Sequence, residues 1–203
     1  MLIFAAAAWR IHESRGAVEI PFETKNRPPA AGPMCPWREP ASDLKLFFPE
    51  AATYQVETRI LSGLRHQLEQ RLGRTPTGDE NALRLYRVYR QEAPVGVVLT
   101  RRVKGEGGAI EIVVAVNASH EICGVRLQRL REPESTAGSL QNPQWLHAFD
   151  GKRDDAPLQL GRDIPDVPAA ARASASSIVE GVRSLLILLA ASNQRELSPA
   201  SHH

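Results

Sequence analysis

The amino-acid sequence predicts an α+β fold: an antiparallel four-stranded meander covered by a long C-terminal helix, with short helices before and after the sheet. Between Ala82 and Glu132, apolar residues recur at every second position in four runs separated by short turns, which is the pattern of strands with one buried face. After Pro168 the apolar spacing changes to three and four, which indicates a helix with one buried face. This spacing is carried by Ile178, Val182, Leu185, Leu186 and Leu189. Such a helix is the natural cover for the apolar face of the meander.

Length and charge limit the class of protein. A chain of 203 residues with a formal net charge of +2 fits one globular domain of ordinary size. The near-neutral charge, with no basic run interleaved with aromatic residues, argues against nucleic acid as a partner. We expect the domain at residues 41–192, preceded at 1–40 by an apolar stub and a proline-rich arm, and followed at 193–203 by a disordered tail.

The apolar run at residues 2–9 is followed by Arg10 and is far shorter than the roughly 20 residues that span a bilayer. No positively charged region precedes it, so it does not form a complete secretory signal. Two interpretations remain open. The run is either the end of a membrane helix that begins upstream or a loosely packed terminus.

Three elements are expected before the meander. Ser42 to Pro49 predicts a short helix that Ser42 caps and the proline stops. Thr53 to Thr58 alternates enough for a short strand. A stripe of leucines at helical spacing then predicts a core helix ended by Gly73, and it consists of Leu61, Leu64, Leu68 and Leu72.

The second and third strands of the meander are joined by the glycine-rich segment 105–108. Such a segment serves either as a hairpin turn or as a phosphate-binding loop, because both need glycine. No GK[ST] sequence follows it, so the turn is the favoured interpretation. The strands themselves are identified by Leu83, Leu85 and Tyr89, then Val95, Val97, Leu99 and Val103, then Ile110, Ile112, Val114 and Val116, and finally Cys123, Val125 and Leu127.

After the sheet, residues 134–138 are small and hydroxylic and predict a loop. Asn142 to Phe149 predicts a short helix with Trp145 and Phe149 on one face, where such an aromatic pair usually belongs to the core. Residues 151–161 form a polar connection whose aspartates have no metal-site spacing.

The start of the last helix, between Pro168 and Ser174, is crowded with small residues. Its first-turn amides and positive dipole end favour an anion, and Arg172 adds a full charge, so a phosphate could bind there. The alternative is a serine-capped helix whose alanine-rich first turn packs on the sheet.

Three motifs together resemble the FMN-binding domain family. Gly105-Glu-Gly-Gly-Ala-Ile110 is similar to the family's G-Y-x-G-x-I, Glu134-Ser-Thr-Ala-Gly138 to its E-T-P-G loop, and Asp166-Val-Pro-Ala-Ala-Ala-Arg-Ala-Ser174 to its D-x-x-S-G-A-T-x-[ST] phosphate site. The family includes the periplasmic flavin subunits of sodium-pumping quinone reductase and of the ferredoxin-oxidising electron-transport complex, with membrane-anchored relatives. The resemblance spans about residues 44–189 and implies the same fold, FMN as cofactor, and a membrane-associated or periplasmic location.

The chain departs from the family pattern at the phosphate motif. Arg172 stands where the family has the threonine that can be esterified to FMN, so covalent attachment by that route is not expected. Ala169 and Ala170 replace the serine and glycine before it, which lets the backbone approach a phosphate less closely. Either Arg172 holds the phosphate through a bidentate ion pair, or the site is inactive in a domain kept for structure or partner binding. The cofactor-binding residues implied by the resemblance are Arg172, Ser174, Ser176, Ser177, Glu134, Ser135, Gly107 and Gly108.

Two functions follow as hypotheses. The first is a noncovalent FMN-binding electron-transfer module at or near a membrane, with FMN and a membrane redox complex as partners. The second is a flavin-free interaction or assembly module that keeps the fold. The spacing of Ser, Cys, His and acidic residues suggests no catalytic set and no metal site, so electron transfer is favoured over conversion of a substrate.

Overall fold

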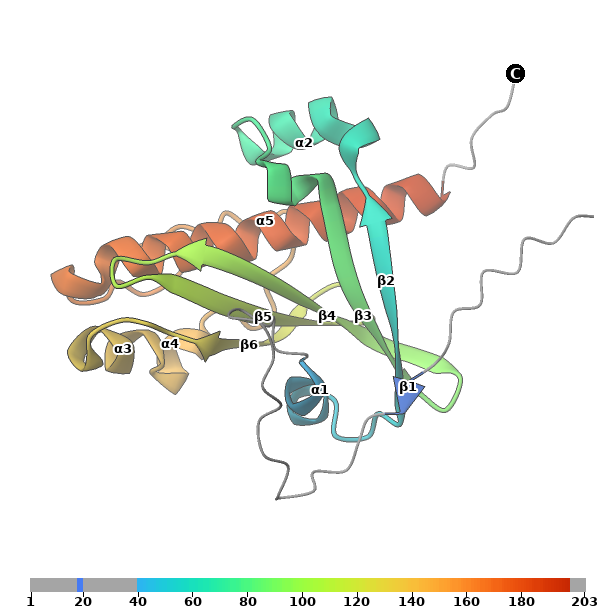
Figure 1. The fold of residues 1–203 in the computed structure, drawn as a ribbon, viewed down its shortest axis with the longest axis horizontal. Coiled ribbons are helices and arrows are strands. Elements are labelled where there is room, and N and C mark those ends of the chain that lie inside the picture. Colours follow the sequence, from blue (N-terminus) through green and yellow to red (C-terminus); the bar gives the residue numbers. More distant parts are fainter. Residues whose placement is uncertain (1–17, 20–39, 198–203) are drawn as a thin grey trace, which may run out of the picture.

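The computed structural model describes residues 18–19 and 40–197, and these form one antiparallel sheet flanked by helices (Figure 1). The predicted α+β architecture with a long C-terminal helix is confirmed. The sheet has six strands in the order β1-β2-β3-β4-β5-β6, rather than the four expected. They are β1 (Val18–Glu19), β2 (Thr53–Ile60), β3 (Ala82–Arg90), β4 (Ala93–Lys104), β5 (Ala109–Asn117) and β6 (Ile122–Arg129).

The two extra strands lie on the β3 side of the meander. β2 was expected as a separate short strand, but it pairs with β3 over its whole length, from Thr53 opposite Tyr89 to Ile60 opposite Ala82. β1 pairs in turn with Thr53 and Tyr54. A helical segment separates β2 from β3 in the sequence, so the alternation of residues alone could not show that these strands pair.

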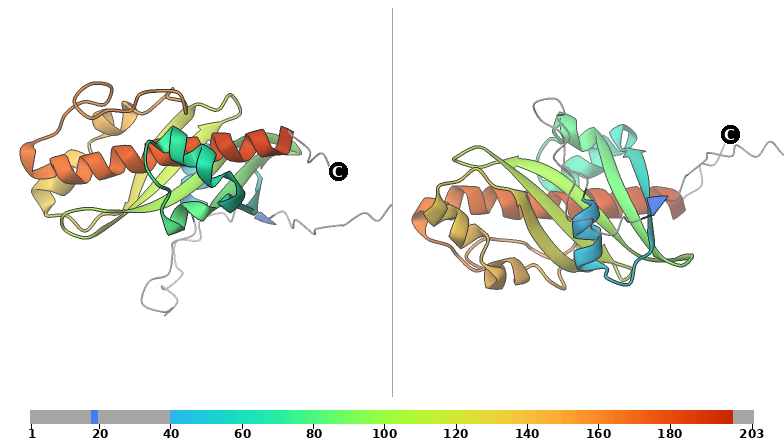
Figure 2. Two further views of the ribbon diagram at one scale, coloured as in Figure 1. Left: turned by 90° about the horizontal axis from the view of Figure 1, so that it is seen from above. Right: turned by 60° about the horizontal axis from the view of Figure 1, so that its bottom comes forward.

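Helix α5 (Arg172–Leu197) crosses one face of the sheet and makes the larger part of the core (Figures 1 and 2). Its start agrees with the sequence prediction, but it continues through residues 193–197, which were expected to belong to the tail. Among the described residues, the segment 169–194 is long and apolar enough to cross a membrane, yet most of it is buried in this fold. The apolar face of α5 meets the sheet through Ile178, Val182, Leu185, Leu186 and Leu189, as the spacing predicted.

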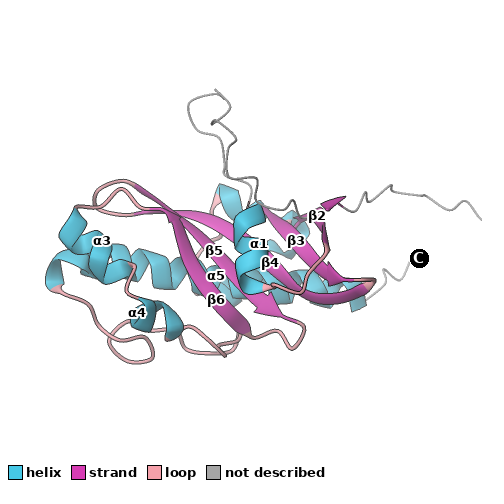
Figure 3. Cartoon of the chain, turned by 90° about the horizontal axis from the view of Figure 1, so that it is seen from below, coloured by secondary structure: helices cyan, strands magenta, loops and turns pink. Residues whose placement is uncertain are grey.

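The opposite face of the sheet is also buried, which the sequence pattern did not indicate. Helix α1 (Ala41–Phe47) lies across this face, on the other side of the sheet from α5 (Figure 3). β5 shows the result, because residues 110–116 are all buried. The second cluster contains Leu44, Phe48, Ala51, Tyr54, Tyr86, Val88, Val98, Val113 and Ala115.

The remaining helices agree with the sequence in part. The leucine stripe forms the 3-10 helix η1 (Ser62–Leu64) and α2 (Arg65–Leu72), which ends at Gly73 with a φ of 73°. α4 (Pro143–His147) lies where a short helix was expected, and Trp145 and Phe149 make an edge-to-face contact at 5.5 Å in the core.

Two local predictions were wrong. Residues 134–138 are not a loop but the first part of helix α3 (Glu134–Leu140), which is held by burial of Thr136 and Leu140. Ser42 does not cap α1, which begins after Pro40 with no side-chain cap. The stub and arm predicted within 1–40 lie mostly outside the described residues, and so does the tail from 198 onward.

The sheet splits between its third and fourth strands. β3 and β4 pair from Arg90 opposite Ala93 to Leu85 opposite Leu99 and then diverge (Figure 1). Beyond that point the start of β3 follows β2 and the end of β4 follows β5. Leu185 and Leu188 of α5 lie beneath the cleft that opens between the two strands.

Candidate functional site

The three segments that carry the resemblance meet at one end of the molecule. The β4–β5 hairpin tip, the start of α3 and the start of α5 lie side by side there (Figures 1 and 2). α3 packs against the 3-10 helix η3 (Ala169–Ala171) that precedes α5. The hairpin is joined to the same place through Glu132, which accepts a hydrogen bond from the Gly107 amide at 2.9 Å.

Ser174 is fully buried at this junction, and its hydroxyl is already used. It donates to Glu132 Oε1 at 2.7 Å and accepts from the Glu106 amide at 3.0 Å. The hydroxyl therefore connects α5 with the hairpin and with the segment that follows β6. Because a phosphate that replaced these contacts would lie against the Glu132 carboxylate, Ser174 is poorly placed to bind one.

The glycines of the hairpin serve close packing and a turn. The Gly105 amide donates to the Gly108 carbonyl at 2.7 Å, so the turn interpretation is confirmed. A Cβ at Gly107 would overlap the Arg131 carbonyl oxygen, and a Cβ at Gly105 would overlap the Glu132 carboxylate. Only glycine lets the hairpin approach the chain this closely.

Arg172 lies at the surface and faces an acidic residue of its own chain. Its guanidinium makes an ion pair with Asp166 at 2.7 Å, and the side chains of the two residues are 60% and 44% exposed. The other oxygen of Asp166 accepts from the Val167 amide at 3.0 Å. Asp166 thus occupies the guanidinium that was expected to hold the flavin phosphate.

The other predicted residues lie around this junction at the surface. Ser176 is exposed and Ser177 is half-buried on α5, while Glu134 and Ser135 are exposed at the start of α3. The structure brings the segments together, but the residue at their centre is Glu132, which sequence reasoning missed. Glu132 lies two positions before Glu134, outside the motif that carries the resemblance. No sequence signal marks it, and only its contacts with the hairpin and α5 in the structure distinguish it from other surface glutamates. That the eight predicted residues bind a cofactor remains a prediction.

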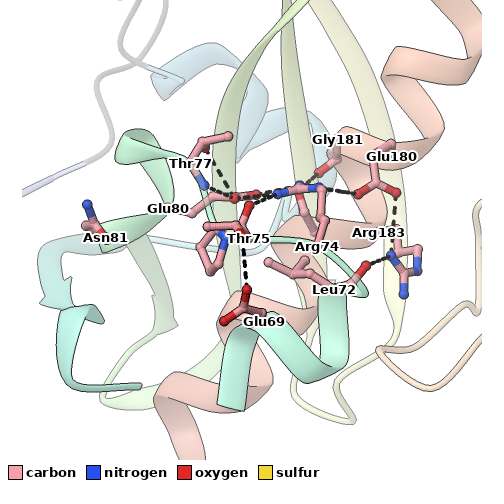
Figure 4. Close-up of polar contacts among 12 residues, drawn as sticks. Glu69, Leu72, Arg74, Thr75, Thr77, Glu80, Asn81, Glu180, Gly181 and Arg183 are labelled. Carbon is pink, nitrogen blue, oxygen red and sulfur yellow. Dashed lines mark hydrogen bonds and ion pairs between the residues drawn. The ribbon is translucent and has the colours of Figure 1, made fainter. Parts of the chain in front are cut away.

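The most strongly perturbed carboxylate of the described residues lies elsewhere, beside the loop that follows α2 (Figure 4). Glu80, fully buried in the 3-10 helix η2 (Gly78–Asn81), accepts from both terminal nitrogens of Arg74 and from Arg101, all at 2.8 Å. Burial alone would raise the pKa of Glu80, but hydrogen bonds from Arg74 and from the Thr77 amide, with the charge of Arg101, lower it to about 2. Because all of these partners belong to the protein, the cluster is structural.

No set of described residues offers a metal centre, since no group of three His, Cys, Asp or Glu side chains there could hold an ion.

We expect Ser174→Ala to lower the free energy of unfolding by about 1 kcal/mol, because it leaves the Glu106 amide and one oxygen of Glu132 without their partner. Ser176→Ala is the matched control: its side chain is exposed on the same helix, so a change within about 0.5 kcal/mol is expected. Urea unfolding of both variants measures the difference. Equal stability of the two would show that the Ser174 contacts contribute nothing.

Comparison with known proteins shows a likeness in structure. No family model matches the sequence, and no curated protein matches it. The crystal structure of one subunit of the Na(+)-translocating NADH-quinone reductase from Parabacteroides distasonis is similar over 79% of this chain and 85% of that chain, with 12% sequence identity and a TM-score of 0.45. A likeness at this level leaves the function to be argued from the residues of this chain.

Proposed function

We propose that this domain is a flavin-free interaction or assembly module. The observation that supports the proposal is that two carboxylates of the chain itself take the donors expected to hold the FMN phosphate. Glu132 accepts from Ser174 and from the hairpin, and Asp166 pairs with Arg172. These acidic residues neutralise the positive end of α5 from within the protein.

The negative charge of Glu132 disfavours a phosphate beside Ser174. A phosphate within hydrogen-bonding distance of the Ser174 hydroxyl would lie next to Glu132, and like charges in contact repel unless one of them is protonated. Gly105 and Gly107 let the hairpin lie close to Glu132, and the Gly107 amide donates to that carboxylate. This arrangement around Ser174 supports the flavin-free proposal.

The test is thermal unfolding of the full chain with and without FMN. We expect no change of the midpoint at millimolar FMN, because a ligand stabilises the protein only if it binds the native state. Binding at 100 times the dissociation constant would add about 2.7 kcal/mol, which is easily detected. A midpoint that rises with FMN but not with riboflavin would contradict the proposal, since the two flavins differ only in the phosphate.

A second candidate is noncovalent FMN binding for electron transfer at or near a membrane, in the periplasm and with a membrane redox complex as partner. One observation favours it: the Arg172–Asp166 pair is exposed, and exposed pairs contribute only about 0–1 kcal/mol, so an anion could displace Asp166. Bound there, the flavin would supply the redox chemistry, and Arg172 and the start of α5 would hold its phosphate. This candidate predicts tighter FMN binding by Asp166→Asn and loss of binding by Arg172→Glu, measured by fluorescence titration.

A further inference from the structure

We propose that residues 13–17 of this chain extend β1 along the outer edge of β2, so that this edge of the sheet is covered from within the molecule. None of the residues of this edge belongs to the predicted flavin site, so the proposal does not depend on the function proposed above. Three observations carry it: the register in which β1 pairs with β2, the backbone groups of β2 that point away from β3, and the charges that this register places opposite one another.

β2 lies at the edge of the sheet, next to the short strand β1 (Figure 1). It pairs with β3 along one side, whereas the described part of β1 covers only its first two residues on the other side. The Leu61 amide, just after β2, donates to the Asn81 carbonyl on the β3 side at 2.7 Å. Since successive residues of an antiparallel strand bond to alternate sides, Val56 and Thr58 direct their N–H and C=O groups away from β3. The described part of the chain places no other strand beside these two residues.

The same edge carries apolar side chains at the surface. Two of the three exposed large apolar residues in the described part of the chain, Val56 and Ile60, belong to β2. A strand edge with outward backbone groups and exposed apolar side chains pairs readily with other chains, and natural proteins cover such edges. An occupant of this edge is therefore expected.

The pairing of β1 with β2 sets the register of any continuation of β1 towards the N-terminus. Val18 lies opposite Tyr54, and the strands run antiparallel. Each step back along the chain from Val18 is therefore matched by one step forward along β2. Continued without a bulge, the ladder places residues 13–17 opposite residues 55–59.

Opposite charges meet in this register. Arg15 lies opposite Glu57, and Glu13 lies opposite Arg59. Opposite charges on directly opposed residues stabilise an antiparallel pair, and like charges destabilise it. The charged residues of the segment 13–17 therefore match those of β2 in sign at both positions.

The alternative registers lack this match. A shift of two residues keeps the same side chains on each face of the sheet. In one direction it would place Arg15 opposite Arg59, and in the other direction it would place Glu13 opposite Glu57. Of the three registers, only the one that β1 sets avoids a pair of like charges.

The charged side chains of β2 lie on the face of the sheet that carries α5. Glu57 pairs with Arg87 at 3.1 Å, and Arg59 donates to Ser192 of α5 at 3.1 Å. Opposite residues share a face, so the charged residues of the added strand would lie on this face too. They would add neighbours of opposite charge to side chains that already have partners, and the backbone ladder with Val56 and Thr58 would hold the strand in place.

The first test is hydrogen exchange of backbone amides in two variants of the full chain. Gly16→Pro removes the N–H that would bond to Val56, whereas Ala17→Pro removes one that would point away from β2, where an edge strand tolerates proline. We expect the Val56 amide to exchange at least tenfold faster in Gly16→Pro than in Ala17→Pro. The Glu57 amide bonds to β3, so its exchange should agree within about twofold and establish that both variants are folded. Equal exchange of the Val56 amide in the two variants would overturn the proposal.

The second test traps the pairing with a disulfide, in a full chain whose Cys35 and Cys123 are changed to serine. Glu13→Cys with Arg59→Cys places two thiols on opposed residues, within the span of a disulfide. Ser14→Cys with Arg59→Cys is the matched control, because its thiols would lie on opposite faces of the sheet. Under mild oxidation we expect the first pair to form a disulfide within one chain at least tenfold faster than the control, as measured by mass spectrometry. Equal rates would overturn the proposal, and so would disulfide-linked dimers as the main product, since these would assign the edge to a second copy of the chain.

Discussion

Glu80→Gln is expected to lower the free energy of unfolding by about 3 kcal/mol at pH 7, because removing one partner from a buried ion cluster leaves the others uncompensated. Glu80 is fully buried between Arg74 and Arg101, and it also accepts from the Thr77 amide at 2.8 Å. These contacts join the loop after α2 to β4 through Arg101. Loss of the Glu80 carboxylate therefore weakens the attachment of the loop after α2 to β4.

The same residue predicts a dependence of stability on pH. The pKa of Glu80 is lowered from 4.5 to about 2 in the folded protein, so its contribution is present above pH 4.5 and is lost as the pH falls towards 2. The stability difference between the wild-type chain and Glu80→Gln should accordingly shrink over that range.

Urea unfolding at pH 7, 4.5 and 3 measures this difference. Glu180→Gln is the matched control, since Glu180 pairs with the same Arg74 at 3.2 Å but is 44% exposed, and its loss is expected to cost at most about 1 kcal/mol. Equal losses for the two variants, or a difference that does not change with pH, would show that the Glu80 cluster does not stabilise the fold in this way.

Gly181→Val is expected to lower the free energy of unfolding by about 2–3 kcal/mol through overpacking. Gly181 faces the sheet from α5, and a Cβ there would lie 2.7 Å from Val103 Cγ1 and 2.9 Å from Ile112 Cδ1. The absence of a side chain lets the helix approach β4 and β5. A larger residue must push the helix away or distort the side chains below it.

The control for Gly181 is another helical glycine. Gly138 of α3 has no atom within 4 Å of the position that an added methyl group would take. Gly138→Ala is therefore expected to stabilise the protein by about 0.5–1 kcal/mol, because alanine lowers the conformational entropy of the unfolded chain. Denaturant midpoints of the two variants should therefore move in opposite directions. A stabilising Gly181→Val would show that α5 is not in tight contact with the sheet.

Periodicity predicted most of the fold because each strand of the meander, and α5, buries one face along its length. It failed where burial comes from another part of the chain. Tyr86 and Val113 are buried in the cluster on the face of the sheet that carries α1, so β3 and β5 have buried residues on both faces. The pairing of β2 with β3 and the divergence of β3 from β4 depend on contacts between distant residues, which no local pattern records.

The candidate site could also be predicted from the sequence only in part. The resemblance pointed to the hairpin, the segment after β6 and the start of α5, and these segments do meet. The partners within them could not be read from the motifs: Ser174 is turned inward to Glu132, and Arg172 is paired with Asp166. A carboxylate and a phosphate accept from the same donors, so only the three-dimensional arrangement shows that this chain supplies its own anions.

The central claim is that Glu132 and Asp166 satisfy the anion-binding groups at the start of α5, so that no flavin phosphate is held there. Equilibrium dialysis of the full chain against FMN tests it most directly. Equal FMN concentrations are expected on both sides of the membrane at every protein concentration. Retention of one FMN per chain, lost in Arg172→Glu, would contradict the claim.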